Sequence, residues 1–150
     1  MQVQDICQTK PVTVEIGSSA REAAFAMREH HVGDVLVVDP VSDGELVGIV
    51  TDRDLVVDVV AEGATDLDST NVEDVMSRDP VSVAFDEPAD DALSAMRNHG
   101  VRRLPVRDGS GGLFGIVTLD DLLSYMTHQM ASLGGIVGAE IRKEVEKDQI

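Results

Sequence analysis

A threonine followed three residues later by an aspartate occurs twice behind the same tripeptide, Gly-Ile-Val. In each copy an apolar run leads into the start of a predicted helix. A threonine at a helix start places its hydroxyl beside unpaired backbone N–H groups and the positive end of the helix dipole, which together form an anion site. An aspartate carboxylate can accept two hydrogen bonds from a vicinal diol. The candidate residues are Thr51 and Asp54 in the first copy, and Thr118 and Asp121 in the second.

The same spacing has a purely structural interpretation. Threonine with aspartate three residues later is a variant of the helix capping box, which stabilises the helix and nothing else. The duplication favours ligand binding, and capping and binding can coexist. Gly48 and Gly115 begin the two copies, and because glycine has no side chain, a ligand ring or another backbone segment can approach each strand closely.

Three arginines are further candidates for contacts with an anion. Arg102 and Arg103 stand just ahead of a run predicted to be a buried strand, in a chain with few positive charges. The alternative is a solvated pair on a strand edge, or partners for the abundant carboxylates. Arg53 lies inside the first motif, but Asp120 takes the matching place in the second. Arg53 is therefore expected to serve at most one site.

These motifs belong to an internal duplication that covers most of the chain. Residues 5–39 align without gaps on 74–108 with 13 identities, and residues 46–55 align on 113–122 with 7 of 10 identical. Each copy predicts a short strand, a helix with an apolar i, i+3, i+4, i+7 face, a β-hairpin and a second helix. The fold class is α/β (α+β), with two β-α-β-β-α repeats. Units of about 60 residues are too small for a comfortable core, so the repeats should pack on one another.

The predicted domain boundaries follow from the repeats. Residues 1–61 form the first repeat, the polar and acidic residues 62–73 a linker, and residues 74–130 the second repeat. The C-terminal tail, 131–150, is expected to be helical. We expect Gly134 and Gly135 to break the preceding helix, with an amphipathic segment resuming at Val137–Val145 as a candidate docking or dimer contact.

The charge of the chain excludes some classes of protein. A count of 28 Asp and Glu against 12 Lys and Arg gives −16, so DNA would be repelled, and four aromatic residues offer little base stacking. No nucleic-acid partner is expected. An acid excess with only three lysines is typical of proteins from concentrated salt, such as those of halophilic archaea, since the screening length falls to about 3 Å at 1 M. The alternative is an ordinary acidic surface.

Other features argue against a membrane or metalloprotein. No apolar run approaches the roughly 20 residues that span a bilayer, and the polar first ten residues do not resemble a signal peptide. A cytoplasmic protein with no membrane partner is predicted. The single cysteine, Cys7, excludes an internal disulfide and a multi-cysteine metal site, so we expect no metal and no resident cofactor.

The repeated units, with GIVTDRD and GIVTLDD preceded by DVMSRDPVSV and HGVRRLPVRD, closely resemble a tandem pair of cystathionine-β-synthase (CBS) domains, or Bateman module. The resemblance covers about residues 3–130. It implies a pseudo-twofold pair with two clefts that bind an adenosine-containing ligand (AMP, ADP, ATP or S-adenosylmethionine), and a flat homodimer. By the same resemblance, ribose would be held by Asp54 and Asp121, and phosphate by Thr51, Thr118, Arg102 and Arg103.

The two clefts are expected to differ. Gly33 and Asp34 occupy, in the first repeat, the positions of Arg102 and Arg103. A carboxylate near a phosphate would repel it by a few kcal/mol at an effective dielectric constant near 20. One nucleotide site is therefore predicted, with a second that is empty or suited to a cationic or uncharged adenosyl ligand.

The resemblance suggests a stand-alone regulatory protein. With no fused effector domain in the sequence, the ligand state would be passed to an unidentified partner protein in trans. The alternative is a scaffold or oligomerisation module that binds no ligand. An enzyme is disfavoured, because the sequence has no nucleophile with a base, no HExxH motif, no P-loop and no metal-ligand cluster.

Overall fold

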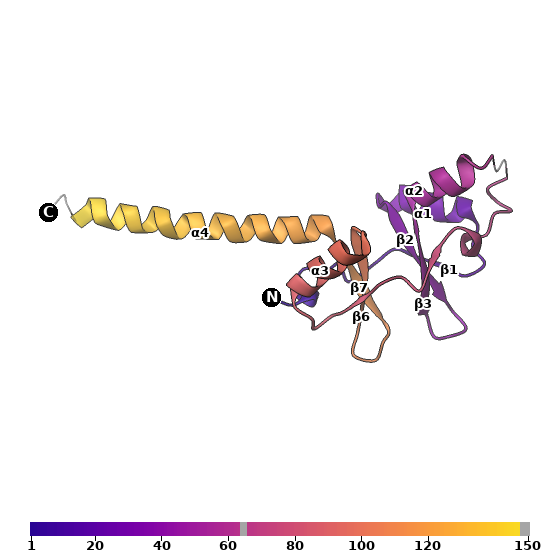
Figure 1. The fold of residues 1–150 in the computed structure, drawn as a ribbon, viewed down its shortest axis with the longest axis horizontal. Coiled ribbons are helices and arrows are strands. Elements are labelled where there is room, and N and C mark those ends of the chain that lie inside the picture. The colour runs from indigo at the N-terminus through magenta and orange to yellow at the C-terminus, as the bar shows by residue number, and fades with distance from the viewer. Residues whose placement is uncertain (64–65, 148–150) are drawn as a thin grey trace.

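The computed structural model describes residues 1–63 and 66–147, which form two similar α+β units and one long projecting helix (Figure 1). The predicted fold class is confirmed. The first unit contains β1 (Thr13–Glu15), α1 (Ala20–His30), β2 (Asp34–Asp39), β3 (Glu45–Thr51) and the helical turn α2 (Asp52–Asp54), which continues with the wider π geometry as η2 (Leu55–Val60). The second contains β5 (Val83–Ala84), α3 (Ala89–His99), β6 (Arg103–Arg107), β7 (Leu113–Thr118) and α4 (Leu119–Lys147).

The two sheets share one topology. In each unit the first strand pairs in parallel with the second, and the second and third form an antiparallel hairpin. The strand order is β5-β6-β7 in the second unit and β1-β2-β3-β4 in the first, where β4 (Ser77–Arg78) adds a fourth, antiparallel strand beside β3. The predicted hairpins are therefore present. Helices α1 and α3 bury the alanine and methionine faces that the sequence pattern indicated, with Ala23 and Ala92 fully covered. Gly100 ends α3 in the left-handed conformation that glycine adopts readily.

The first residues of each repeat complete the other repeat. The 3-10 turn η1 (Val3–Asp5) places Val3 in the core of the second unit, and Gln8 exchanges two backbone hydrogen bonds with Ile116 of β7 (2.9 and 3.0 Å). In the same way β4, near the start of the second repeat, pairs with β3 of the first. This reciprocal exchange ties the units together, since neither core is closed without a segment from elsewhere in the chain.

The segment predicted as a linker is not solvated along its whole length. Residues 64 and 65 lie outside the described residues. Leu67 packs against the first core, and Val72, at the start of the 3-10 turn η3 (Val72–Asp74), is fully buried in it. A third apolar cluster joins the two sheets directly and consists of Leu36, Leu46, Ile49 and Ile116, with Leu113 against it.

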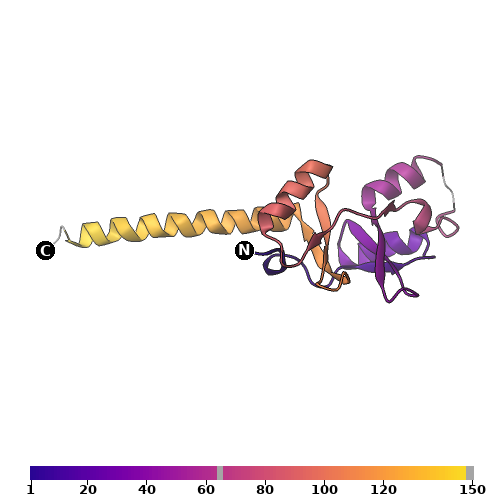
Figure 2. The same ribbon diagram turned by 60° about the horizontal axis from the view of Figure 1, so that its bottom comes forward.

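Helix α4 corrects one prediction. Gly134 and Gly135 do not break it, and the helix runs without interruption from Leu119 to Lys147. Glycine inside a helix costs only about 1 kcal/mol relative to alanine, and no proline follows to stop the helix. The tail is helical as expected up to Lys147, whereas residues 148–150 lie outside the described residues. Both views show α4 extending away from the two units (Figures 1 and 2). No helix in the described residues is long and apolar enough to cross a membrane.

Candidate functional site

A cleft of about 550 Å³ lies between the two units. Its first wall carries the end of β3 and the turn α2, with Thr51, Arg53 and Asp54. Its opposite wall carries the start of β6, with Arg102 and Arg103. The structure thus brings the threonine–aspartate motif of one repeat together with the arginine pair of the other. The remaining lining residues are Ile49, Asp52, Ser77, Arg78, Asp79, Pro80, Val81, His99, Gly100, Val101 and Pro105.

Both threonine–aspartate motifs form capping boxes. The Thr51 amide donates to Asp54 Oδ2 (2.8 Å), and the Asp54 amide donates to Thr51 Oγ1 (3.1 Å). The Thr118 amide and hydroxyl both donate to Asp121 Oδ2 (2.8 Å each), and the Asp121 amide donates to Thr118 Oγ1 (3.2 Å). The structural interpretation of the motif is therefore correct. The cap uses Oδ2 of Asp54, and Oδ1 takes no part in it. Asp54 also lines the cleft.

Four of the chain's nine arginines line this one cleft: Arg53, Arg78, Arg102 and Arg103. Sequence reasoning missed Arg78, which lies near the start of the second repeat and reaches the cleft because β4 pairs with β3. The repeat alignment carried a signal for this residue. At the offset of 69 residues, Arg78 aligns with the neutral Thr9, so it is a positive charge that only the second repeat has, as are Arg102 and Arg103. Three carboxylates, of Asp52, Asp54 and Asp79, line the same cleft, so its guanidinium groups exceed its carboxylates by one in a chain of net charge −16.

Arg103 is also held by the first repeat. Its Nη1 lies 3.3 Å from Asp34 Oδ1 and donates to the backbone carbonyl of Gly33 at 3.0 Å. The Asp34 side chain is only 13% exposed. Burial raises the pKa of Asp34, the positive charge of Arg103 opposes that rise, and the nearby carboxylate of Asp52 adds to it. Arg103 therefore compensates a buried carboxylate while its side chain borders the cleft.

The two motif glycines are approached by the protein itself. A Cβ atom added to Gly48 would collide with the Met76 side chain, and one added to Gly115 would collide with the backbone carbonyl of Gln8. The sequence left two alternatives for the close approach at these glycines, a ligand ring or another backbone segment. The structure shows the second, because the exchanged segments of the protein lie against both strands.

The surroundings of the second motif differ from those of the first. The Gln8 side-chain amide donates to Asp121 Oδ1 (3.4 Å), the oxygen that the cap does not use. By the repeat alignment, the counterparts of the four cleft arginines are Thr9, Gly33, Asp34 and Asp120. The structure places the side chains of Arg102 and Arg103 on the wall of the cleft that contains Thr51.

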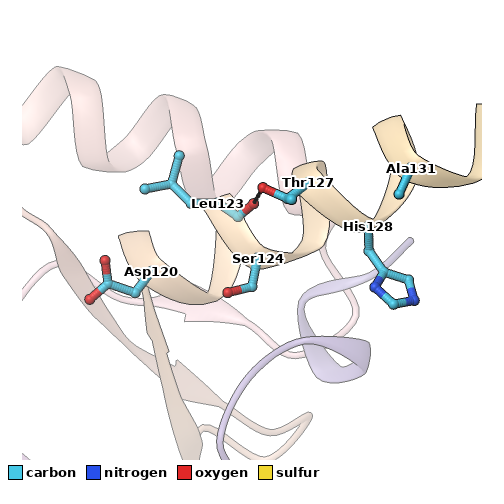
Figure 3. A pocket seen from close by; sticks show the side chains of 6 residues that line it. All are labelled: Asp120, Leu123, Ser124, Thr127, His128 and Ala131. Atoms are coloured by element: carbon cyan, nitrogen blue, oxygen red, sulfur yellow. Dashed lines mark hydrogen bonds between the residues drawn. The ribbon is translucent and has the colours of Figure 1, made fainter. Parts of the chain in front are cut away.

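A second hollow, of about 440 Å³, runs along the first turns of α4 (Figure 3). Its lining residues all come from this helix and are Asp120, Leu123, Ser124, Thr127, His128 and Ala131. It has none of the guanidinium groups of the cleft between the units. Among the described residues, no three His, Cys, Asp or Glu side chains are grouped so as to hold a metal ion.

Comparison with known proteins accounts for the repeated architecture. The sequence profile of the CBS domain matches twice, at residues 3–60 and 72–128. The chain belongs to the CBS-domain family. The predicted resemblance to a tandem CBS pair is thereby confirmed, and the cleft between the units is a cleft between two CBS domains.

Individual relatives agree with this assignment. The CBS domain-containing protein YhcV of Bacillus subtilis is 37% identical over 130 residues, which span 86% of this chain and 89% of that protein. The uncharacterized protein MK0525 of Methanopyrus kandleri is 35% identical over 131 residues, and this CBS pair covers 87% of its own length but only 65% of that protein. A solved structure of the CBS domain pair of protein MJ0100, in complex with 5′-methylthioadenosine and S-adenosyl-L-methionine, has 28% identity and a TM-score of 0.76, covering 86% of this chain and 98% of that one.

Proposed function

We propose that this CBS pair is a regulatory protein that binds an adenosine-containing ligand with a phosphate group in the cleft of Thr51 and Asp54. The observation that supports this is the convergence of four arginines on the cleft that contains this motif. In the proposed complex, Asp54 accepts hydrogen bonds from the ribose hydroxyls, since a carboxylate is acceptor-only. Thr51 lies at the phosphate, with the arginines completing the anion site. AMP, ADP and ATP fit this combination of groups.

We propose that a second site, at Thr118 and Asp121, has a different preference. The positions equivalent to the four arginines are neutral or acidic, and of the two acidic ones Asp120 would repel a phosphate, whereas Asp34 is paired with Arg103. An uncharged or cationic adenosyl ligand, of the kind bound in the MJ0100 complex, suits these surroundings better. Gln8 would have to release Asp121 Oδ1 before ribose could bind there, because it donates to that oxygen.

Signalling would follow from the position of the cleft between the two units. A ligand that contacts Thr51 on one unit and Arg102 on the other favours the orientation in which both contacts form, and a partner protein that prefers this orientation senses the occupied state. The proposed activity is therefore regulatory, in a homodimer acting on a partner in trans, and involves no catalysis. A scaffold that binds no ligand is the second candidate.

Thermal shift with AMP, ADP, ATP, NAD and S-adenosylmethionine in molar KCl separates these two functions. A ligand present at a hundred times its Kd adds about 2.7 kcal/mol to the free energy of unfolding, which raises the midpoint by about 5–10 °C in a domain of this size. No shift with any of them would support the scaffold.

Two matched variants, Asp54→Ala and Asp121→Ala, then separate binding from capping. Each loses a capping carboxylate, so each is expected to be less stable by about 0.5–2 kcal/mol. The shift caused by a phosphate-bearing nucleotide should disappear in Asp54→Ala and persist in Asp121→Ala. Equal nucleotide shifts in both variants would contradict the assignment of the phosphate site.

A further inference from the structure

One face of α4 carries seven large apolar side chains at steps of three or four residues, the spacing that keeps side chains on one side of a helix. We call this set the apolar stripe, and its members are Leu123, Met126, Met130, Leu133, Val137, Ile141 and Val145. Their exposed fractions range from 51% to 69%. Leu122 is the one buried residue among the described residues of α4. The two CBS domains therefore leave the stripe uncovered.

The hollow along the first turns of α4 borders this stripe and shares Leu123 with it (Figure 3). All of its lining residues come from α4.

We propose that the apolar stripe binds the α4 of a second copy of this chain, in an antiparallel helix pair. The stripe begins at Leu123 and ends at Val145, so its midpoint is Gly134, and an antiparallel pair centred there matches the whole stripe of one copy with that of the other. A Cβ added to Gly134 or Gly138 would meet no atom within 4 Å. Near the crossing point these two glycines, four residues apart on the side of the stripe, allow two backbones to approach closely.

The area of the stripe is sufficient for a stable dimer. Burying one apolar side chain removes on the order of 80 Å² from water. Seven side chains from each of two copies therefore remove about 1,100 Å², above the roughly 1,000 Å² expected of a specific interface. One helix pair of this kind would thus cover the whole apolar stripe.

Charge selects the antiparallel orientation. Residues 140–147 contain three acidic and three basic side chains, so the far end of α4 is neutral, and almost all of the net charge of −16 lies before Glu140. A parallel pair would place two strongly acidic CBS pairs side by side. In the antiparallel pair each neutral helix end meets the acidic body of the other copy, and the bodies are separated by a helix of 29 residues, about 44 Å long. That separation far exceeds the screening length of about 8 Å in physiological salt.

Sedimentation of the full chain between 1 and 100 µM tests the interface. The unmodified chain should be dimeric, and Leu133→Glu should raise the dimer Kd on the order of 100-fold, since it places a carboxylate in the centre of an apolar interface. Ser132→Glu adds the same charge to a different face of the helix and should leave the Kd within about threefold, as expected of a surface position outside the interface. A monomer at 100 µM, as expected if another protein covers the stripe, would overturn the proposal. So would a dimer that Leu133→Glu does not weaken.

Cysteine cross-linking tests the orientation and does not depend on how Leu133→Glu folds. In a Cys7→Ala background, a mixture of Leu123→Cys and Val145→Cys chains should form a disulfide between unlike chains under mild oxidation. Val145→Cys alone should form none, because the two copies of residue 145 lie at opposite ends of the pair. Efficient cross-linking of Val145→Cys to itself would show a parallel pair and overturn the proposed arrangement.

Discussion

Replacing Arg103 by methionine is expected to destabilise the protein by about 2 kcal/mol at pH 7.5 and by much less near pH 5, because the substitution leaves Asp34 without its positive partner. Arg103 Nη1 lies 3.3 Å from Asp34 Oδ1, with side chains 28% and 13% exposed. At that distance and an effective dielectric constant near 20, the Coulomb attraction is about 5 kcal/mol. The net loss is smaller, since the arginine no longer has to be desolvated and water reaches part of the site.

The pH dependence has a definite sign. Burial raises the pKa of Asp34 above the ordinary 3.8, so the folded state holds this proton more tightly than the unfolded state. The contribution of Asp34 to the free energy of unfolding therefore falls as the pH rises from 3.8 through the folded pKa, and it is constant above that. Removing Arg103, whose charge lowers the pKa of Asp34, moves the folded pKa upward. The variant should lose stability over a wider range of pH, and its difference from the unmodified protein should shrink as the carboxyl becomes protonated.

Thermal and urea unfolding at pH 7.5, 6.5, 5.5 and 4.5 measure this difference. A loss of 2 kcal/mol corresponds to a fall of about 4–8 °C in Tm for a chain of this length. Asp34→Asn and the double variant complete a double-mutant cycle, with an expected coupling energy of about 1–2 kcal/mol at pH 7.5. A loss that is the same at all four pH values, together with a coupling energy near zero, would refute the assignment of Arg103 as the charge partner of Asp34.

Two further predictions concern the exchanged segments and the acidic composition. Gly115→Ala should destabilise the protein by about 3 kcal/mol in urea unfolding, because the new methyl group meets the Gln8 carbonyl. The control Gly135→Ala, in the open part of α4, should raise stability by about 0.5–1 kcal/mol. A Gly115→Ala variant as stable as the unmodified protein would argue against the close approach of the N-terminal segment. The Tm should be several degrees higher in molar KCl than in low salt, since salt screens the self-repulsion of a net charge of −16, and equal midpoints would favour an ordinary acidic surface.

Most of the local structure could be predicted from the sequence. Local patterns indicated the apolar face of α1, with Ala23 and Met27, and the turn between β2 and β3. The same patterns recur in the second repeat, which strengthened each prediction. The prediction that Gly134 and Gly135 interrupt the helix was wrong, because it rested on residue type alone. Glycine is only a weak signal against a helix, and nothing in the fold competes with α4 for those residues.

The candidate site was predicted in part. Thr51 and Asp54 were recognised because their spacing has chemical meaning on a helix start, and Arg102 and Arg103 because they stand out in an acidic chain. Arg78 was missed because its role depends on pairing between β4 and a strand of the other repeat, which no local pattern encodes.

The sequence by itself determined the two CBS repeats, the order of their elements and the fact that the repeats differ in charge, because these are properties of residue type and spacing along the chain. Only the tertiary structure decided which motif lies beside the arginines. That depends on contacts between residues about 50 positions apart, across two units that exchange the segments around Val3 and Ser77. It also depends on a single ion pair, Arg103 with Asp34, in which two positions that are equivalent in sequence meet between the repeats as opposite charges.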